Sequence, residues 1–138
     1  LGDVYKRQHK SLLFAKNECS DLVYFVEDDY LHRQEAINEM ILTYERISSQ
    51  LNRELILCPA DYPYLYSNIE NSKIFIGHKR HWRTIKETLI TFLTSKKMIL
   101  KYWEDFKLMS TLRHHPMEKR LHLFQIVATR KMVKIPRQ

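Results

Sequence analysis

One stretch of the chain decides the fold: Leu22-Val23-Tyr24-Phe25-Val26, followed directly by Glu27-Asp28-Asp29. The first five residues form a continuous apolar run, which is typical of a strand buried on both faces of a parallel sheet. Three carboxylates then end the run. Because ligands of open α/β sheets sit outside the carboxyl ends of the strands, we expect these acids to line a ligand site.

The segments that follow alternate between the helical and the extended pattern. From Arg33 to Leu51 apolar residues recur at helical spacing, with Glu35, Glu39, Glu45 and Arg46 on the other face. Further strands are expected at 54–58, 73–76 and 88–93, and a helix capped by Thr94 or Ser95 is expected to run to Phe106. This order predicts an α/β domain.

Composition limits the possible classes of protein. The 138 residues, 44% of them hydrophobic, are enough for one domain with a real core. Two cysteines make no disulfide framework, and the apolar runs are far shorter than the roughly 20 residues that span a bilayer. We therefore expect a cytoplasmic protein without a transmembrane segment, peripheral to a membrane at most.

The net charge of +7 is concentrated at the ends of the chain. Residues 9–112 hold fourteen Lys or Arg and fourteen acids, whereas residues 113–138 hold seven and one. A neutral middle argues against a nucleic-acid partner. We interpret residues 1–8 as a non-native, adapter-like peptide and residues 121–138 as a basic tail of frameshifted or truncated origin, with a genuine basic tail as the alternative.

Three adjacent carboxylates repel one another, and a divalent cation would offset this repulsion. Hard oxygen ligands suit Mg²⁺ or Mn²⁺, which can bridge a carboxylate to a diphosphate. The alternative is structural: Asp28 or Asp29 caps the helix that follows, and Glu27 is solvated.

The segment from Val23 to Tyr30 resembles the DXD-type segment of GT-A glycosyltransferases of the family-2 type, in the variant that begins with Glu. Related segments follow in the expected order over residues 9–120: 55–66, 77–82, 88–95 and 115–118. The resemblance implies a partial GT-A, Rossmann-like sheet with flanking helices that lacks its N-terminal nucleotide-binding strands. It also implies that the 138 residues alone bind donor weakly and are inactive.

The resemblance assigns roles to single residues. Asp29 would bind the metal, while Glu27 and Asp28 would face the ribose or sugar of the donor. Glu118 would be the general base on the acceptor hydroxyl, unless it is a solvated loop acid.

Two further groups are candidates for the acceptor side. Asp61 and Tyr62, in a loop rich in Tyr and Pro, could line the acceptor, since aromatic faces stack on sugar rings; a rigid connecting loop is the alternative. Trp82, in the basic segment 78–83, could meet the donor diphosphate or an anionic acceptor, or could pack inward beneath a solvated loop.

The sequence thus favours an enzyme that transfers a sugar from a nucleotide-diphosphate donor to a hydroxyl of a glycan or lipid-linked acceptor, with Mn²⁺ or Mg²⁺ as cofactor. A metal-dependent nuclease or phosphohydrolase could use the same acids. A basic nucleic-acid-binding module without enzymatic activity is the third possibility.

Overall fold

The computed structural model of the protein describes residues 2–28, 30–60, 72–85, 91–108 and 125–128. The helices are α1 (Gly2–Glu18), α2 (Ala36–Leu51), α3 (Lys96–Lys101) and α4 (Trp103–Leu108). The strands are β1 (Leu22–Phe25), β2 (Ile56–Cys58), β3 (Ile74–Ile76), β4 (His81–Thr84), β5 (Phe92–Ser95) and β6 (Gln125–Ala128). The α/β class predicted from the sequence is confirmed.

The strands form one mixed sheet in the order β1-β5-β2-β6-β4-β3. Only β2 and β6 are parallel neighbours, and the other four adjacent pairs are antiparallel. The expectation of a doubly buried parallel strand at 22–26 is wrong, because β1 pairs with antiparallel β5 at the end of this order. Three of its four residues are only partly buried. Both neighbours of β5 run opposite to it, so β1 and β2 point the same way.

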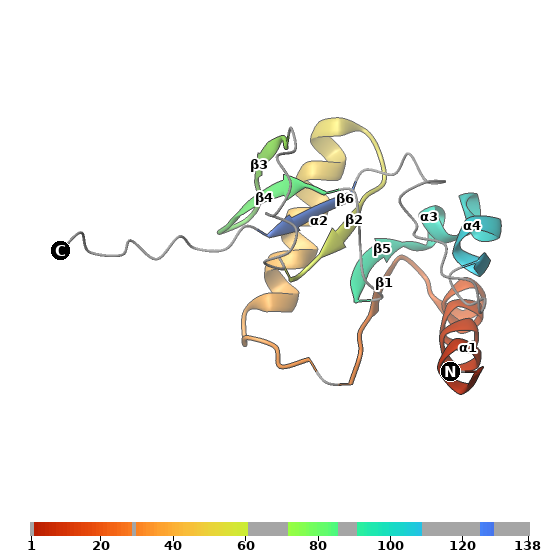
Figure 1. Cartoon of the computed structure of the whole chain (residues 1–138). Coiled ribbons are helices and arrows are strands. Elements are labelled where there is room, and N and C mark those ends of the chain that lie inside the picture. The colour runs from red at the N-terminus through yellow and green to blue at the C-terminus, as the bar shows by residue number, and fades with distance from the viewer. Residues whose placement is uncertain (1, 29, 61–71, 86–90, 109–124, 129–138) are drawn as a thin grey trace.

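Helices cover both faces of the sheet (Figure 1). On one face α2 packs its apolar stripe against β2, β4 and β5, in a cluster made by Met40, Tyr44, Ile47, Leu55, Leu57, Trp82 and Leu93. On the other face α1, α3 and α4 enclose a second cluster around Phe25, Ile56, Phe92, Ile99 and Phe106. The hydrophobic effect therefore holds three layers together.

The ends of α2 and α3 follow from local sequence. Asn52 adopts the left-handed conformation (φ 49°, ψ 49°), which Asn tolerates better than most residues. Its N–H and that of Arg53 bond back to the carbonyls of Ser49 and Ser48, which ends α2 in a Schellman motif. The predicted cap of α3 is confirmed at Ser95, whose Oγ accepts the Met98 N–H at 3.1 Å.

Four elements differ from the sequence-based expectation. The strand expected at 88–93 is found at 92–95 as β5, and residues 88–90 lie outside the described residues. The predicted helix 94–106 is broken at Tyr102 into α3 and α4. The basic segment 78–83 contains a strand, β4, because Trp82 and Arg83 pair with both β3 and β6. Residues 125–128, which the sequence pattern predicts to lie in a basic tail, form β6 between β2 and β4. Residues 2–8 belong to α1, while the suggested origins of residues 1–8 and 121–138 stay predictions.

Candidate functional site

The acidic segment leaves the carboxyl end of β1 and is tied to the start of β5. The side chains of Glu27 and Asp28 are exposed, and Asp29 lies outside the described residues. The backbone N–H of Glu27 donates to Oγ1 of Thr91 at 3.2 Å, and Tyr30 N–H donates to the Glu27 carbonyl at 3.3 Å. The turn is thereby fixed at its first residue, and both described carboxylates face solvent.

A second contact folds the segment back onto β1. The hydroxyl of Tyr24 lies 2.7 Å from Nε2 of His32, and the two rings meet edge to face with centroids 5.6 Å apart. Burial, reinforced by the nearby Tyr30 and Cys58 groups, raises the pKa of Tyr24 to about 12. Tyr24 is therefore neutral at physiological pH, and its hydroxyl can share a hydrogen bond with either tautomer of His32.

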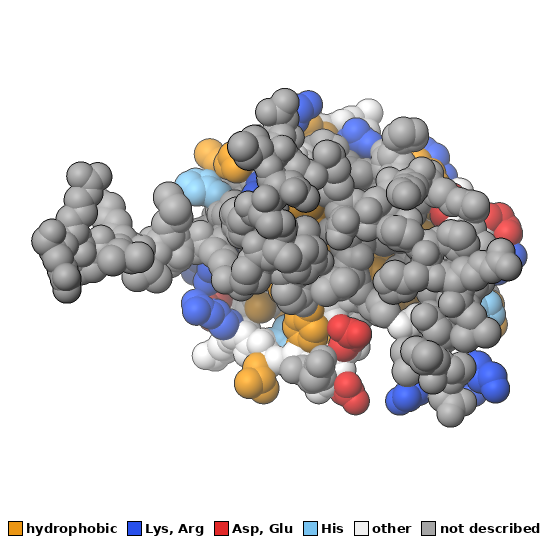
Figure 2. Space-filling model, viewed as in Figure 1, with side chains coloured by type: hydrophobic (Ala, Val, Ile, Leu, Met, Phe, Trp, Pro, Cys, Tyr) orange, Lys and Arg blue, Asp and Glu red, His pale blue; other side chains and the backbone are white. Residues whose placement is uncertain are grey.

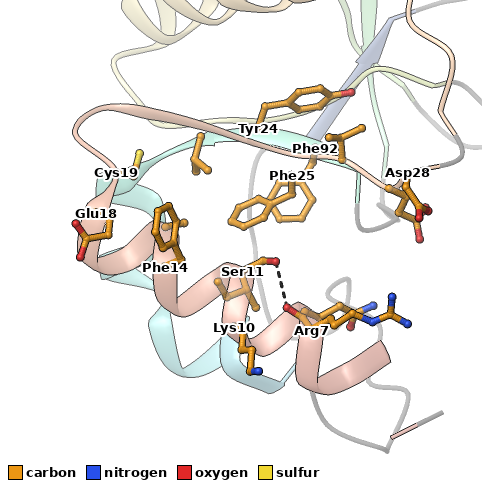
Figure 3. A pocket seen from close by; sticks show the side chains of 16 residues that line it. Arg7, Lys10, Ser11, Phe14, Glu18, Cys19, Tyr24, Phe25, Asp28 and Phe92 are labelled. Atoms are coloured by element: carbon orange, nitrogen blue, oxygen red, sulfur yellow. Dashed lines mark hydrogen bonds between the residues drawn. The ribbon is translucent and has the colours of Figure 1, made fainter. Parts of the chain in front are cut away.

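The described carboxylates stand at one end of a cleft of about 1040 Å³ between α1 and β1. Phe25 and Phe92 lie at its middle, while Arg7 of α1 and Asp28 lie at the same end (Figure 3). Phe14, on α1, is 69% exposed at the opposite end. The cleft thus combines an apolar wall with a charged end at Arg7 and Asp28, and Glu18 adds an acid at the other end.

Cations and carboxylates both border this cleft. Lys10 joins Arg7 on the helix side, and Glu27 joins Asp28 on the strand side. Acidic side chains are visible at the solvent surface below β1 (Figure 2). A ligand that carries both a phosphate and polar hydroxyls would find groups of matching charge and hydrogen-bonding capacity here.

Only some of the sequence-predicted site residues can be placed. Asp29, Asp61, Tyr62 and Glu118 lie outside the described residues. Glu27 and Asp28 are brought together at the cleft. Trp82 packs inward, since it is 1% exposed and its indole N–H donates to Glu39 Oε1 at 3.2 Å. Of the two interpretations of Trp82, the inward-packed one matches the structure.

Glu39 is a buried carboxylate, although the helical pattern places it on the polar face of the helix. That placement is wrong, because its residue exposure is 5%. Its oxygens accept hydrogen bonds from the backbone N–H groups of Lys79 (2.8 Å) and Arg80 (3.1 Å), from Trp82 and from the Thr43 hydroxyl (3.1 Å). Four donors offset the cost of burying the carboxylate. The sequence signal for the Thr43 contact is that Glu39 and Thr43 are four residues apart and therefore lie on one face of the helix.

The strand directions place the acids and the β3–β4 loop at the same edge of the sheet. Phe25 pairs with Phe92 at the carboxyl end of β1, and Trp82, near the start of β4, pairs with Ala128 at the carboxyl end of β6. Five strand spacings of ~4.8 Å separate β1 from β3, about 24 Å in all. The chain also leaves β2 at this edge, through Pro59 and Ala60, and Asp61 follows in sequence.

Two further features are absent from the described residues. No three His, Cys, Asp or Glu side chains among them converge as metal ligands do. None of the helices within the described ranges is long and apolar enough to cross a membrane.

The chain was also compared with known proteins. No protein-family model, curated protein or solved structure matches it.

Proposed function

We propose that this chain is the GT-A-type part of a glycosyltransferase, which moves a sugar from a nucleotide-diphosphate donor to a hydroxyl of a glycan or lipid-linked acceptor. The observation that carries the proposal is the position of Glu27 and Asp28, which follow a strand end at the charged end of a large, apolar-walled cleft. A cleft of this kind suits a ligand with an apolar ring system at one end and a diphosphate at the other.

The donor would lie along the cleft with its diphosphate at the charged end. Lys10 supplies a cation on the α1 side of the cleft, and Asp29, next to Asp28 in sequence, is assigned to Mn²⁺ or Mg²⁺. The metal would neutralise charge on the departing diphosphate. Glu27 and Asp28 would accept hydrogen bonds from hydroxyls of the ribose or sugar.

The chemical step is a substitution at the anomeric carbon of the donor sugar. The acceptor oxygen forms a bond to that carbon as the bond to the diphosphate oxygen breaks, and nucleoside diphosphate leaves. The hydroxyl proton passes to a base, which we assign to Glu118. Asp61 and Tyr62, which follow Pro59 and Ala60 after the end of β2, are assigned to the acceptor side.

The contacts around the acids support a binding role rather than helix capping. Glu35, and not Asp28, immediately precedes α2, and its side chain makes no cap hydrogen bond. Asp28 is separated from Ala36, the first residue of α2, by seven residues. The capping alternative therefore does not account for Asp28.

Metal binding by the acidic segment is the first test. Mn²⁺ titration of the 138-residue chain, followed by electron paramagnetic resonance, should show a site that Asp29→Asn removes and that Asp28→Asn weakens. Glu45→Gln, at an exposed position of α2, is the matched control and should bind like wild type. Equal Mn²⁺ binding by wild type and Asp29→Asn would refute the metal assignment.

The reaction class needs a second measurement in the longest reading frame that encodes the chain. We expect Mn²⁺-dependent release of nucleoside diphosphate from a panel of nucleotide sugars, lost in Asp29→Ala. Cleavage of a phosphodiester substrate instead would identify a phosphohydrolase. Tight binding of an oligonucleotide, unchanged in Asp29→Ala, would identify a nucleic-acid-binding module.

A further inference from the structure

The β3–β4 hairpin, defined here as residues Lys73–Thr84, carries two exposed aliphatic side chains on one face. Ile74 and Ile76 are each 61% exposed. Phe75, between them, points to the other face and packs against the cluster beneath α2. Figure 2 shows hydrophobic and His side chains side by side at this end of the molecule. Exposed isoleucines at alternate strand positions form a small apolar surface.

The hairpin is firmly held by α2. Glu39 accepts the backbone N–H groups of Lys79 and Arg80, and Oγ1 of Thr43 accepts that of His78 at 3.0 Å. Gly77 N–H closes the turn on the Arg80 carbonyl at 2.8 Å. Because the loop backbone is fixed, the isoleucines and the loop cations are presented together without a further ordering cost.

The exposed charge of the hairpin is positive. Residues 73–84 contain four Lys or Arg and two His but no acid. Lys73, His78 and Lys79 are exposed. Two described acids contact the hairpin: Glu39, which is buried, and Glu35, which lies 3.8 Å from Arg80. The hairpin therefore combines aliphatic side chains with excess positive charge.

We propose that the β3–β4 hairpin docks onto an anionic lipid surface, with Ile74 and Ile76 inserted among the acyl chains and Lys73 and Lys79 at the headgroups. Aliphatic insertion combined with lysine contacts is how peripheral proteins bind such membranes. A second copy is a poorer occupant, because a symmetric contact at β3 would bring the lysines of both copies together. Single-stranded nucleic acid binds through exposed aromatic platforms, whereas Phe75 and Trp82 face the core.

Lipid docking goes beyond the proposed sugar transfer and does not depend on it. It would also orient the molecule, since the hairpin loop and the acids Glu27 and Asp28 share one edge of the sheet, about 24 Å apart. A lipid-linked acceptor would then approach the cleft from the membrane.

Vesicle sedimentation with the full 138-residue chain tests the proposal. Wild type should sediment with vesicles of equal parts phosphatidylglycerol and phosphatidylcholine, but not with phosphatidylcholine alone. Ile74→Ser/Ile76→Ser should lower the partition coefficient at least about tenfold. Lys73→Glu/Lys79→Glu should lower it by about fivefold or more per residue.

Matched controls carry the same chemical changes elsewhere. Leu100→Ser and Lys101→Glu alter an exposed aliphatic and an exposed cationic residue on α3 and should sediment like wild type. Tryptophan emission, to which the buried Trp82 and the partly buried Trp103 contribute, shows whether each variant is folded. The proposal is overturned if Ile74→Ser/Ile76→Ser sediments with anionic vesicles like wild type, or if wild type does not sediment with them. A dimer that Ile74→Ser/Ile76→Ser abolishes, with no vesicle binding, would equally overturn it in favour of a second copy.

Discussion

The hydroxyl of Tyr24 hydrogen-bonds Nε2 of His32 at 2.7 Å across eight residues of sequence, and so closes the segment that carries Glu27 and Asp28 onto its own strand. With the Glu27–Thr91 hydrogen bond, this contact gives the acidic segment two anchors, one on β1 and one on Thr91, the residue directly before β5. The carboxylates thus stand on a supported turn, which would preorganise them for the proposed metal and sugar contacts.

Removal of the Tyr24 hydroxyl should loosen the acidic segment without unfolding the protein. We expect Tyr24→Phe to speed amide hydrogen exchange of residues 27–33 about fivefold, the equivalent of one hydrogen bond of about 1 kcal/mol. Tyr102→Phe, at a half-buried position on the boundary of α3 and α4, is the control. Identical exchange of residues 27–33 in wild type and Tyr24→Phe would show that the contact does not hold the segment.

The loss of unfolding free energy at high pH should depend on Tyr44. Its hydroxyl donates to Oε2 of Glu54 at 2.5 Å and accepts Leu55 N–H at 3.1 Å. Burial, followed by the hydrogen bond to Glu54, raises the pKa of Tyr44 from 10.0 to about 12. The unfolded chain therefore releases this proton first, and the stabilisation is complete below pH 10 and lost as pH rises towards 12.

Urea unfolding between pH 9 and pH 12 measures this loss, to which Tyr44 should contribute about 2 kcal/mol. Tyr44→Phe should be less stable than wild type at neutral pH, because Leu55 N–H loses its acceptor. Its unfolding free energy should nevertheless fall less steeply than that of wild type between pH 9 and pH 12. Parallel declines of the unfolding free energy in the two proteins would rule out a contribution from Tyr44. Tyr24, whose pKa is also raised to about 12, contributes equally to both proteins.

The sequence predicted the elements that depend on local pattern. The apolar run before the acids is a strand, the amphipathic segment is α2, and Ser95 caps α3. Periodicity, capping and strand propensity act within a few residues, so one sequence suffices to detect them.

Features that depend on tertiary contacts were missed. β4 carries His81 and Arg83 between β3 and β6, and only its partners reveal it as a strand. β6 lies within a segment that looks like a basic tail, because four residues carry little pattern by themselves. The edge position of β1 also follows from pairing and not from its apolar content.

For the candidate site, the sequence identified the acids but neither Tyr24–His32 nor the cleft. Contacts between residues distant in sequence, such as Glu27 with Thr91, cannot be read from one chain. The burial of Glu39 was hidden for the same reason, since its backbone donors lie forty residues further along.

Loss of the Glu39 carboxylate should destabilise the β3–β4 hairpin. In Glu39→Ala the N–H groups of Lys79 and Arg80 and the indole N–H of Trp82 lose their acceptor, and we expect a loss of about 3 kcal/mol or more in urea unfolding. Glu39→Gln keeps the shape but turns one acceptor into a donor, and it should cost about 1–2 kcal/mol. Glu45→Ala, on an exposed turn of α2, should change stability little; an equal loss there would contradict a specific role for Glu39.

Position 77 requires glycine because Thr43 and Trp82 approach its Cα closely, and not because of its backbone angles, since neither described glycine has a positive φ. A Cβ at position 77 would stand 2.5 Å from Thr43 Oγ1 and 2.5 Å from Cδ1 of the Trp82 ring. Gly77→Ala must push the turn off α2, and we expect a loss of about 1–3 kcal/mol in unfolding free energy. The same shift would lengthen the hydrogen bonds that the loop donates to Glu39, so the losses in Gly77→Ala and Glu39→Ala should be less than additive in the double variant. Strict additivity would mean that the turn and the carboxylate act independently.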